Sequence, residues 1–419
     1  MTKRLLLFSY FFPPLGGAGV QRALKLCRAA PDLGWHVSVV ACAPAAGDSL
    51  DLSMVAEVPD DLEVVRTGAL RLHRLGAWAN RWLTPDPYLG WLPEAGDAAR
   101  DLCRQRPFDA VMSTSMPYTA HLAAMEIKRD FQIPWLCDLR DPWTDNRFMH
   151  HYRSPAPHGL WRRWIDRRLE RAVYRHADLV SVTTEPLRQL LIDRHGLDPD
   201  RVWTARNGYD EADFASALPM PGLASHRQPP GQDAVMTLLF AGSMYQGYTL
   251  APLFAAWQAL LTRRPEVRLR LVMYSDNVGI LRGLLAEFPA VAPFVTQGPR
   301  VSHAEVVARY ATGDLLVLSA LDDLSTPGKL FEFIRSGTAV LAFAVQGAEA
   351  RALLDRTGTG CCAPADDPEA GARTLEGLYD QWRAGQPLSA PRAAEVAALE
   401  RTGAYRTLLA ALDARVARR

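Results

Sequence analysis

Short β-rich runs alternate with longer helical patterns along most of this 419-residue chain. In the first half, the patterns predict strands at 5–10, 36–41, 62–65, 110–113, 133–137 and 179–183. They predict helices between several of these strands, at 20–30, 94–104, 118–129 and 161–175. Strands that alternate with helices in this way form parallel sheets with helices on both faces. The alternation therefore restricts the fold to the α/β class.

A break near the middle divides this pattern into two. Asn207-Gly208 is a turn signal, and residues 215–233 are rich in proline, glycine and serine. The alternation then resumes, with strands predicted at 237–241, 267–274, 294–297, 315–319 and 339–343, and helical patterns close the chain at 368–383 and 390–415. Two α/β units of similar size in tandem predict a cleft between them. We expect three parts: a first domain at 1–206, a second at 207–385 that begins with a linker at 207–233, and a helical segment at 386–419 that returns to the first domain.

Composition excludes several classes of protein. With 48% hydrophobic residues, 22% charged residues and a net charge of +1, the chain has no global attraction to nucleic acid. Its six cysteines form no CxxC pair and no zinc-ligand spacing. The apolar run LLLFSYFF near the N-terminus is short and lacks a small-residue cleavage site, and no run reaches the ~18 apolar residues of a spanning helix. We expect a cytoplasmic protein with reduced cysteines that binds no metal and no nucleic acid.

Hydroxyl groups, a glycine, a lysine and a glutamate gather after the predicted strand at 315–319, in Ser325-Thr326-Pro327-Gly328-Lys329 and Glu332. In open α/β sheets ligands bind at this edge, where strands end and helices begin. Helix N-terminal N–H groups and one lysine suit a phosphate, and a glutamate one turn later suits sugar hydroxyls. The segment is no Walker A loop, because Leu330 follows Lys329 where serine or threonine is required. We expect a nucleotide diphosphate here; the alternative is a strand–turn–helix unit with a surface lysine.

A second glycine-rich turn follows the first predicted strand, in Pro13-Pro14-Leu15-Gly16-Gly17-Ala18-Gly19. Such a turn lets the backbone approach a ligand closely, although it can also be purely structural. The dinucleotide fingerprint GxGxxG fails, because the sixth position from Gly17 is Arg22. The second predicted strand also ends without an acidic residue that would hold a ribose. A dinucleotide-dependent dehydrogenase is therefore disfavoured.

Eight segments, taken together, resemble the retaining glycosyltransferases of the GT-B fold, in the family 4 (group 1) type. They occur in the order of that family and cover nearly the whole chain, and IPWLCDLRDPWT and STPGKLFEF are the most specific. The segments are FSYFFPPLGGAG, PDPYLGW (85–91), STSMPYTAHL (113–122), IPWLCDLRDPWTDN (133–146), ADLVSVTTE (177–185), ARNGYD (205–210), LLFAGSMYQG (238–247) and STPGKLFEFIRSGTAVLAF (325–343). The resemblance implies an α/β fold of GT-B type, with two Rossmann-like α/β/α domains facing across a cleft.

The resemblance also implies roles for individual residues. Gly16 and Gly17 resemble the loop beneath the donor diphosphate, and His121 the histidine that contacts the transferred sugar. Glu332 resembles the glutamate that binds the donor ribose, with Ser325, Thr326, Pro327 and Gly328 lining the donor pocket and Lys329 beside it. Gly242 and Ser243, after the first strand of the second domain, belong to the same pocket. Many members carry an arginine and a lysine after this glycine and a glutamate eight residues before the ribose glutamate; this chain has neither cation there, and Leu324 at the second position.

The implied activity is transfer of a sugar from a nucleotide-diphosphate sugar, with a UDP-sugar expected, to an acceptor hydroxyl, with retention and without metal or cofactor. The donor phosphate would accept the acceptor's proton. The acceptor would be a glycan, a lipid-linked compound or a small molecule in a bacterial biosynthesis. A catalytically silent protein that binds nucleotide sugar or assists assembly is the alternative, which the missing cations favour. An epimerase of the same fold is a third, weaker interpretation.

Two further segments have open interpretations. Asp138, Arg140 and Asp141 follow a predicted strand, and they form either an internal ion pair or part of the active site, with Asp141 a catalytic candidate and Arg140 a substitute cation. The segment 161–171 is basic and aromatic. It is either a solvated helix with its tryptophans packed inward, or an interfacial helix on the inner face of a membrane.

Overall fold

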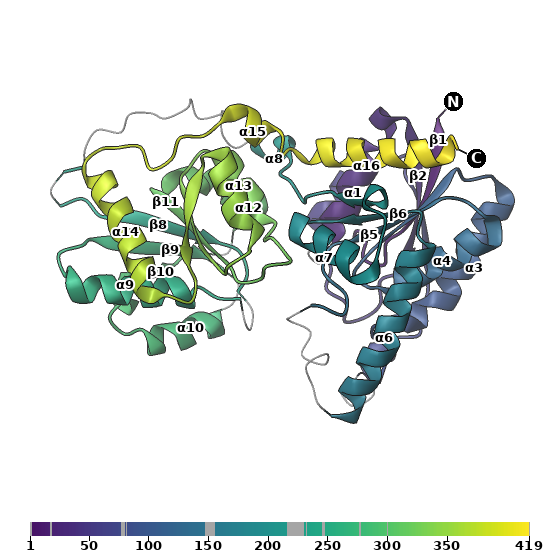
Figure 1. The fold of residues 1–419 in the computed structure, drawn as a ribbon, viewed down its shortest axis with the longest axis horizontal. Coiled ribbons are helices and arrows are strands. Elements are labelled where there is room, and N and C mark those ends of the chain that lie inside the picture. Colours follow the sequence, from purple (N-terminus) through teal and green to yellow (C-terminus); the bar gives the residue numbers. More distant parts are fainter. Residues whose placement is uncertain are drawn as a thin grey trace. The chain divides into compact units, whose positions relative to one another are not determined.

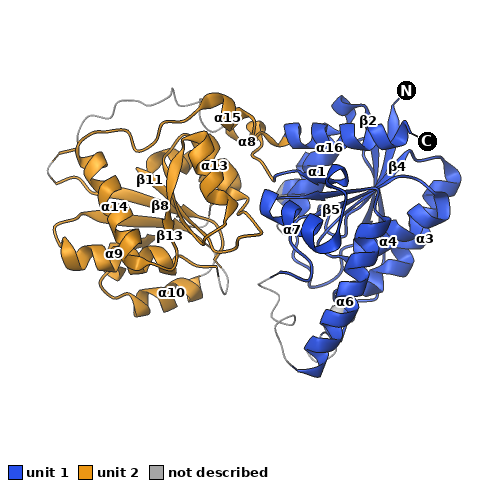
Figure 2. Cartoon of the chain, viewed as in Figure 1, with its two compact units in different colours: residues 1–206, 402–419 blue, residues 207–401 orange. Residues whose placement is uncertain are grey.

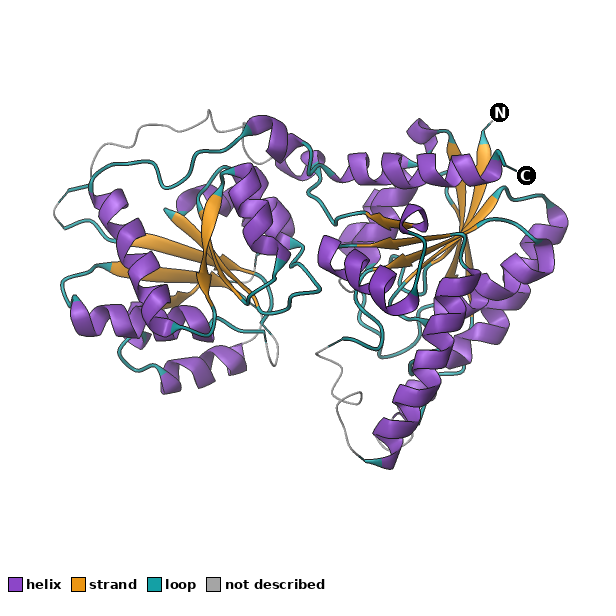
Figure 3. Cartoon of the chain, viewed as in Figure 1, coloured by secondary structure: helices purple, strands orange, loops and turns teal. Residues whose placement is uncertain are grey.

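The computed structural model describes residues 2–16, 19–76, 80, 82–146, 156–215, 230–231, 233–244, 248–275, 278–299 and 301–418. Contacts divide the chain into two compact units (Figure 2). Unit 1 comprises residues 1–206 and 402–419, and unit 2 comprises residues 207–401. Each unit is a parallel sheet between two layers of helices (Figures 1 and 3).

Unit 1 has a seven-stranded sheet in the order β3-β2-β1-β4-β5-β6-β7. Its strands are β1 (Lys3–Phe8), β2 (Trp35–Cys42), β3 (Glu63–Thr67), β4 (Ala110–Thr114), β5 (Trp135–Leu139), β6 (Leu179–Val182) and β7 (Val202–Thr204). Its helices are α1 (Val20–Ala29), α3 (Leu92–Gln105), α4 (Thr119–Phe131), α6 (Pro157–His176), α7 (Glu185–His195) and α16 (Arg401–Val416).

Side chains alternate between the two faces of the unit 1 sheet, as the period of a strand requires. In β1, Leu5 and Leu7 pack with α1 and α16, whereas Leu6 and Phe8 pack with α3, α4, α6 and α7. Because both faces are covered, β1 is apolar on both sides, which is typical of a central parallel strand. α16 contributes four buried side chains to the first of these layers, Tyr405, Leu408, Leu409 and Leu412.

Unit 2 has a six-stranded sheet in the order β10-β9-β8-β11-β12-β13. Its strands are β8 (Met236–Ala241), β9 (Leu269–Tyr274), β10 (Val295–Gln297), β11 (Leu315–Ala320), β12 (Val340–Ala344) and β13 (Gly360–Pro364). Its helices are α8 (Glu211–Ala215), α9 (Ala251–Arg263), α10 (Val278–Glu287), α11 (His303–Arg309), α12 (Lys329–Ser336), α13 (Glu349–Thr357), α14 (Pro368–Arg383) and α15 (Ala393–Ala397). None of the helices in the described ranges combines the length and the hydropathy needed to cross a bilayer.

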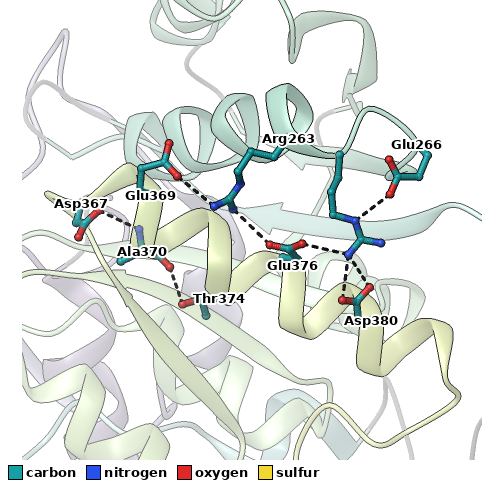
Figure 4. A network of polar contacts seen from close by, with 9 residues as sticks. Arg263, Glu266, Asp367, Glu369, Ala370, Thr374, Glu376 and Asp380 are labelled. Carbon is teal, nitrogen blue, oxygen red and sulfur yellow. Dashed lines mark hydrogen bonds and ion pairs between the residues drawn. The ribbon is translucent and has the colours of Figure 1, made fainter.

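Ion pairs on the surface link α9 to α14, which pack side by side on one face of the unit 2 sheet (Figure 4). Arg263 contacts Glu369 at 3.2 Å and Glu376 at 3.4 Å. Arg264, next in the chain, contacts Glu376 at 3.2 Å and Asp380 at 2.9 Å. These groups are partly exposed, so each pair stabilises the fold by only ~0.2–1 kcal/mol. The apolar residues beneath them hold the two helices in place.

The chain passes between the units twice, and the two passages lie side by side. Tyr209 N–H donates to the Leu399 carbonyl at 3.2 Å, and Arg401 N–H donates to the Tyr209 carbonyl at 2.9 Å. The Arg401 guanidinium also donates to the Asn207 carbonyl at 2.7 Å. Gly208 has φ +63°, and a Cβ there would lie 2.7 Å from the Leu399 carbonyl oxygen. The predicted Asn207-Gly208 turn is thus where one passage is fixed to the other.

This pairing corrects the predicted end of the chain. A single helix was expected at 390–415, but the structure has α15 and α16 with a break at 398–400. The helix stops because residues 399–401 bond to Tyr209 instead. Val396 and Leu399 pack in the core of unit 2, so residues 386–401 belong to unit 2 and only 402–419 to unit 1. Most of the predicted linker, residues 216–229 and 232, lies outside the described residues.

Candidate functional site

The strand order reverses between β1 and β4 in unit 1, and between β8 and β11 in unit 2. At such a switch point the connections leave in opposite directions, and ligands bind beyond the carboxyl ends of the two strands. The predicted site residues follow these four strands. Gly16 follows β1 and His121 follows β4, whereas Gly242 and Ser243 follow β8 and the segment 325–332 follows β11.

Lys329 and Gly242 come together at the switch point of unit 2. Lys329 is the first residue of α12, and its Nζ donates to the Ala241 carbonyl at 2.8 Å and lies 4.8 Å from the Phe240 ring centroid. Gly242 has φ +125°, and a Cβ there would stand 1.7 Å from Lys329 Nζ. Only glycine allows the ammonium group this close to the end of β8.

Lys329 supplies a positive charge at this switch point. Burial lowers its pKa to about 8, and nearby Glu332 partly opposes this shift. At neutral pH the group is therefore mostly charged, and no carboxylate among the described residues forms an ion pair with it. An ammonium group at a helix N-terminus and a strand end that contacts an uncharged carbonyl and a ring face keeps its positive charge, and it is arranged to attract an anion.

Two residues that the sequence did not indicate hold Glu332. Tyr310 Oη donates to Glu332 Oε2 at 2.7 Å, and His303 Nε2 lies 3.1 Å from Oε1. Burial alone would raise the pKa of Glu332, but the contacts with His303 and Tyr310 outweigh it and lower the pKa. The carboxylate is therefore ionised and fixed. A carboxylate has about four acceptor positions, so lone pairs remain for a ligand's hydroxyl groups.

The loop between β11 and α12 is ordered by its own hydroxyls. Ser325 Oγ donates to Asp322 Oδ2 at 2.6 Å, and Thr326 Oγ1 donates to Glu349 Oε2 at 3.3 Å. Pro327 accepts the N–H of Leu330 at 3.0 Å, which starts the helix. No atom lies within 4 Å of where a Cβ on Gly328 would stand, so the backbone is open to solvent there. Ser325 and Thr326, expected to line the pocket, thus use their protons to shape the loop.

His121 lies on the first turn of α4 and is fully buried. Trp135 Nε1 donates to Ser113 Oγ at 2.9 Å, and Ser113 Oγ lies 2.8 Å from His121 Nδ1. Ser113 is also buried and has no other recorded acceptor, so its proton goes to Nδ1. His121 is then the Nε2–H tautomer. Burial lowers its pKa to about 3, although Asp138 opposes the shift, so the ring is neutral.

The Nε2–H of His121 is a buried donor that has no partner in the described part of the chain. The rings of Tyr118 and Trp143 lie near the imidazole, with centroids 6.3 Å away in both cases. A buried donor without an acceptor is uncommon and marks a position where a ligand oxygen is expected. That His121 contacts the transferred sugar stays a prediction.

The two aspartates at the end of β5, Asp138 and Asp141, lie in different environments. Asp138 is fully buried and accepts two bonds from Arg22, at 2.7 and 2.8 Å, and one each from Ser181 and Thr114. Burial alone would raise its pKa, but Arg22 outweighs burial and lowers it, so this residue forms the internal ion pair. Asp141 is partly exposed and forms no recorded hydrogen bond with a described residue. Its catalytic role stays a prediction.

Arg140 lies against the first glycine turn. A Cβ on Gly19 would stand 2.1 Å from Arg140 Nη1. Gly19 immediately precedes α1, so the guanidinium lies at the N-terminus of this helix. No ion pair of Arg140 is recorded with a described residue. Gly17, the other predicted residue of this turn, lies outside the described residues.

A cavity of about 230 Å³ opens beside Gly16 in unit 1, a feature that the sequence did not reveal. The rings of Tyr10, Phe11 and Tyr88 form one wall, with centroids 4.7 to 5.4 Å apart. Asp48 and Arg71 provide charged groups, and Arg71 Nη1 donates to Tyr10 Oη at 2.9 Å. Aromatic faces together with a few fixed polar groups are typical of small-molecule sites. The volume is below the ~300–1,000 Å³ of drug-sized pockets and suits a single ring.

Two family models match the chain, one in each unit. Residues 16–208 match a glycosyl transferase 4-like domain, and residues 236–381 match the glycosyl transferases group 1. Together the matches cover most of the chain. The chain belongs to the group 1 glycosyltransferases. A curated relative of this group 1 glycosyltransferase, the D-inositol 3-phosphate glycosyltransferase of Pseudarthrobacter chlorophenolicus, is 30% identical over 186 residues. That match covers 43% of each protein, so this chain spans less than half of the relative's length.

Solved structures share the fold of this group 1 glycosyltransferase over nearly its whole length. Sucrose-phosphate synthase from Thermosynechococcus elongatus matches with a TM-score of 0.68 and 16% identity over 99% of both chains. The Anabaena protein HepE, solved in complex with UDP-glucose, matches with a TM-score of 0.64 and 11% identity over 98% of this chain and 99% of the other. These neighbours confirm the predicted GT-B fold.

Proposed function

We propose that the protein transfers a sugar from a nucleotide-diphosphate sugar, expected to be a UDP-sugar, to an acceptor hydroxyl with retention of anomeric configuration. Its family membership supports glycosyl transfer. The observation that carries the proposal is Lys329, a half-buried ammonium group that pairs with no carboxylate in the described part of the chain. It is held against Gly242, where many relatives place their cations. Lys329, which follows β11, would thus replace the arginine and lysine that this chain lacks after β8.

The leaving diphosphate gains negative charge as the glycosidic bond breaks. Lys329 and the positive end of the α12 dipole would stabilise this charge, and Glu332 would accept the ribose hydroxyls. Each lost donor of this kind costs ~2.7–4 kcal/mol of transition-state stabilisation in oxyanion holes. Because Tyr310 and His303 already fix the carboxylate, little ordering is left for the ribose to impose.

Unit 1 would supply the acceptor side. The cavity beside Gly16 takes one ring of the acceptor, and the Nε2–H of His121 donates to a hydroxyl of the transferred sugar. A donor phosphate oxygen takes the proton from the acceptor hydroxyl as the new bond forms on the face that the diphosphate leaves. This route requires no carboxylate nucleophile and no metal ion. We assign the protein to the synthesis of a bacterial glycan, glycolipid or glycosylated metabolite in the cytoplasm.

Nucleotide binding tests the assignment. In a thermal-shift screen against UDP, GDP, dTDP and ADP, the cognate nucleotide at 100 times its Kd should stabilise the protein by ~2.7 kcal/mol. Glu332→Ala should weaken its binding by ~1.5–3 kcal/mol, since a hydrogen bond to a charged acceptor is lost. Glu376→Ala, on α14, removes a carboxylate of the same unit and should leave the affinity unchanged. Equal calorimetric affinities for the wild type and Glu332→Ala would refute the ribose role.

A silent nucleotide-sugar-binding protein is the second candidate. It is favoured by the sequence after Gly242, where Ser243 and Met244 stand in place of cations. The two candidates differ in what happens to the donor without acceptor. A transferase should release nucleotide slowly by hydrolysis, and Lys329→Gln should slow this release. If the wild type and Lys329→Gln both bind the nucleotide sugar tightly and neither hydrolyses it, the silent alternative would be favoured.

A further inference from the structure

Three charged residues of the helix α6 lie on its buried side. Arg162, Asp166 and Glu170 are at most 3% exposed. Arg162 donates to the Asn80 carbonyl at 2.8 Å, and Glu170 accepts from Thr144 Oγ1 at 2.6 Å and from Tyr174 Oη at 3.1 Å. The bonds to Asn80 and Thr144 fix one face of α6 against the rest of unit 1. The orientation of the helix is therefore set by these polar contacts together with the core packing of Val173 and Tyr174.

The opposite face begins with large apolar side chains. Leu160, Trp161 and Trp164 are 54%, 45% and 51% exposed. The solvated-helix interpretation expected the tryptophans to pack inward, and the structure places them outward. Their rings lie 6.0 Å apart, and the Arg168 guanidinium lies 4.1 Å from the Trp164 ring. Adjacent exposed tryptophans mark a surface that is covered by a partner, because isolated ones are the rule on a free surface.

The same face continues as a row of arginines. Arg167, Arg168, Arg171 and Arg175 are exposed at helical spacing after Trp164. Both carboxylates of α6 point inward, and no ion pair joins these four arginines to a described carboxylate. We call the outward residues the α6 face: Leu160, Trp161, Trp164, Arg167, Arg168, Arg171 and Arg175. This face is apolar at its N-terminal end and cationic along the rest.

We propose that the α6 face lies on an anionic phospholipid bilayer. The arginines would contact lipid phosphates, and Trp161, Trp164 and Leu160 would enter the boundary between headgroups and acyl chains, where tryptophan is favoured. Figure 1 shows the N-terminal half of α6 projecting past the other helices of unit 1, so a flat surface can reach it. A second copy of the chain fits less well, because an isologous contact would bring the arginine rows together. Contact of the α6 face with lipid does not depend on which sugar the protein transfers.

Vesicle flotation tests it on the full chain. The wild type should float with vesicles that contain phosphatidylglycerol and far less with phosphatidylcholine alone, and salt should reduce the binding. Tryptophan emission should shift to the blue on binding. Trp161→Ser with Trp164→Ser should abolish the shift and weaken binding at least tenfold, and Arg167→Gln with Arg171→Gln should weaken it roughly 25-fold at about fivefold for each arginine.

The matched controls remove similar charge or apolar area at positions outside the α6 face. Arg104→Gln with Arg129→Gln removes two exposed arginines of the same unit, and Phe294→Ser removes an exposed aromatic residue of unit 2. Both should bind vesicles like the wild type. No binding of the wild type to anionic vesicles would overturn the proposal, as would equal losses in the controls. A dimer that dissociates in the tryptophan variant, or tighter binding to RNA than to vesicles, would assign the face to another partner.

Discussion

Lys329 forms no ion pair with a carboxylate in the described ranges, yet it is held within the protein at the end of β8. Removing an ammonium group from water disfavours its charged form, which is why its pKa falls to about 8. A bound diphosphate would reverse this, because a nearby anion favours the charged form. The residue is therefore a sensitive reporter of whether an anion binds where we propose.

We predict that nucleotide affinity is level below about pH 8 and falls above it by up to tenfold per pH unit. The sign follows because only the charged lysine attracts the diphosphate, and the free protein loses that proton above its pKa. Lys329→Gln should bind more weakly at pH 7 and lose this slope, and it should lower kcat more than it raises KM. Lys128→Gln, in unit 1, is the control. Calorimetry across this pH range that gives the same slope for wild type and Lys329→Gln would place Lys329 outside the site.

Ser113 fixes the tautomer of His121 in our interpretation. Ser113→Ala should leave both His121 Nδ1 and Trp135 Nε1 without their partner, so His121 should exchange between tautomers. We expect turnover to fall roughly tenfold, or about 1.4 kcal/mol. Nitrogen chemical shifts of His121 should show one tautomer in the wild type and two in the variant, and Ser113→Thr should restore the first. A single, unchanged tautomer in Ser113→Ala would contradict the assignment.

At the scale of the elements, the alternating pattern was sufficient for the α/β class and for most strands. It missed α7, α8, β7, α13 and β13. Of these, β7, α8 and β13 have only three to five residues, so they are too short for a strong apolar run. The sequence pattern also could not predict contacts between residues far apart in the chain. The bonds of His303 and Tyr310 to Glu332 join α12 to residues that lie 29 and 22 positions earlier, respectively. The sequence named Glu332 and Lys329 as site residues, but it could not place Lys329 Nζ against Gly242, because that contact depends on the pairing of β8 with β11.

The predicted return of a C-terminal helix can be tested through its packing. Leu412 is fully buried between α16 and the unit 1 sheet. Leu412→Ala should destabilise unit 1 by ~2–5 kcal/mol, since it removes buried apolar area and leaves a cavity. Arg406→Ala, on the exposed side of α16, should change stability by less than ~0.5 kcal/mol. Hydrogen exchange should show the loss of protection in β1 and β2 but not in β8 and β11. An equal loss in both units would mean that α16 stabilises more than unit 1.

At the scale of the whole molecule, the chain connects its units through two adjacent backbone segments, 207–209 and 399–401. These segments are hydrogen-bonded to each other. Arg401 fixes this junction by its main chain and by its guanidinium, and Gly208 permits the close approach. Neither passage can be displaced without breaking the bonds to the other. The sequence showed only the Asn207-Gly208 turn, because the partner segment lies almost two hundred residues later.

The position of α16 sets the order in which the protein can be completed during synthesis. Residues 1–206 leave the ribosome first, but one layer of their core lacks Tyr405, Leu408, Leu409 and Leu412 until the whole of unit 2 has been made. At ~5–20 residues per second this takes roughly 10–40 s. For that time the nascent chain presents an uncovered apolar surface to chaperones. A chain that stops before residue 402 would keep this surface open, so we expect a chaperone that binds apolar surface to distinguish it from a finished copy.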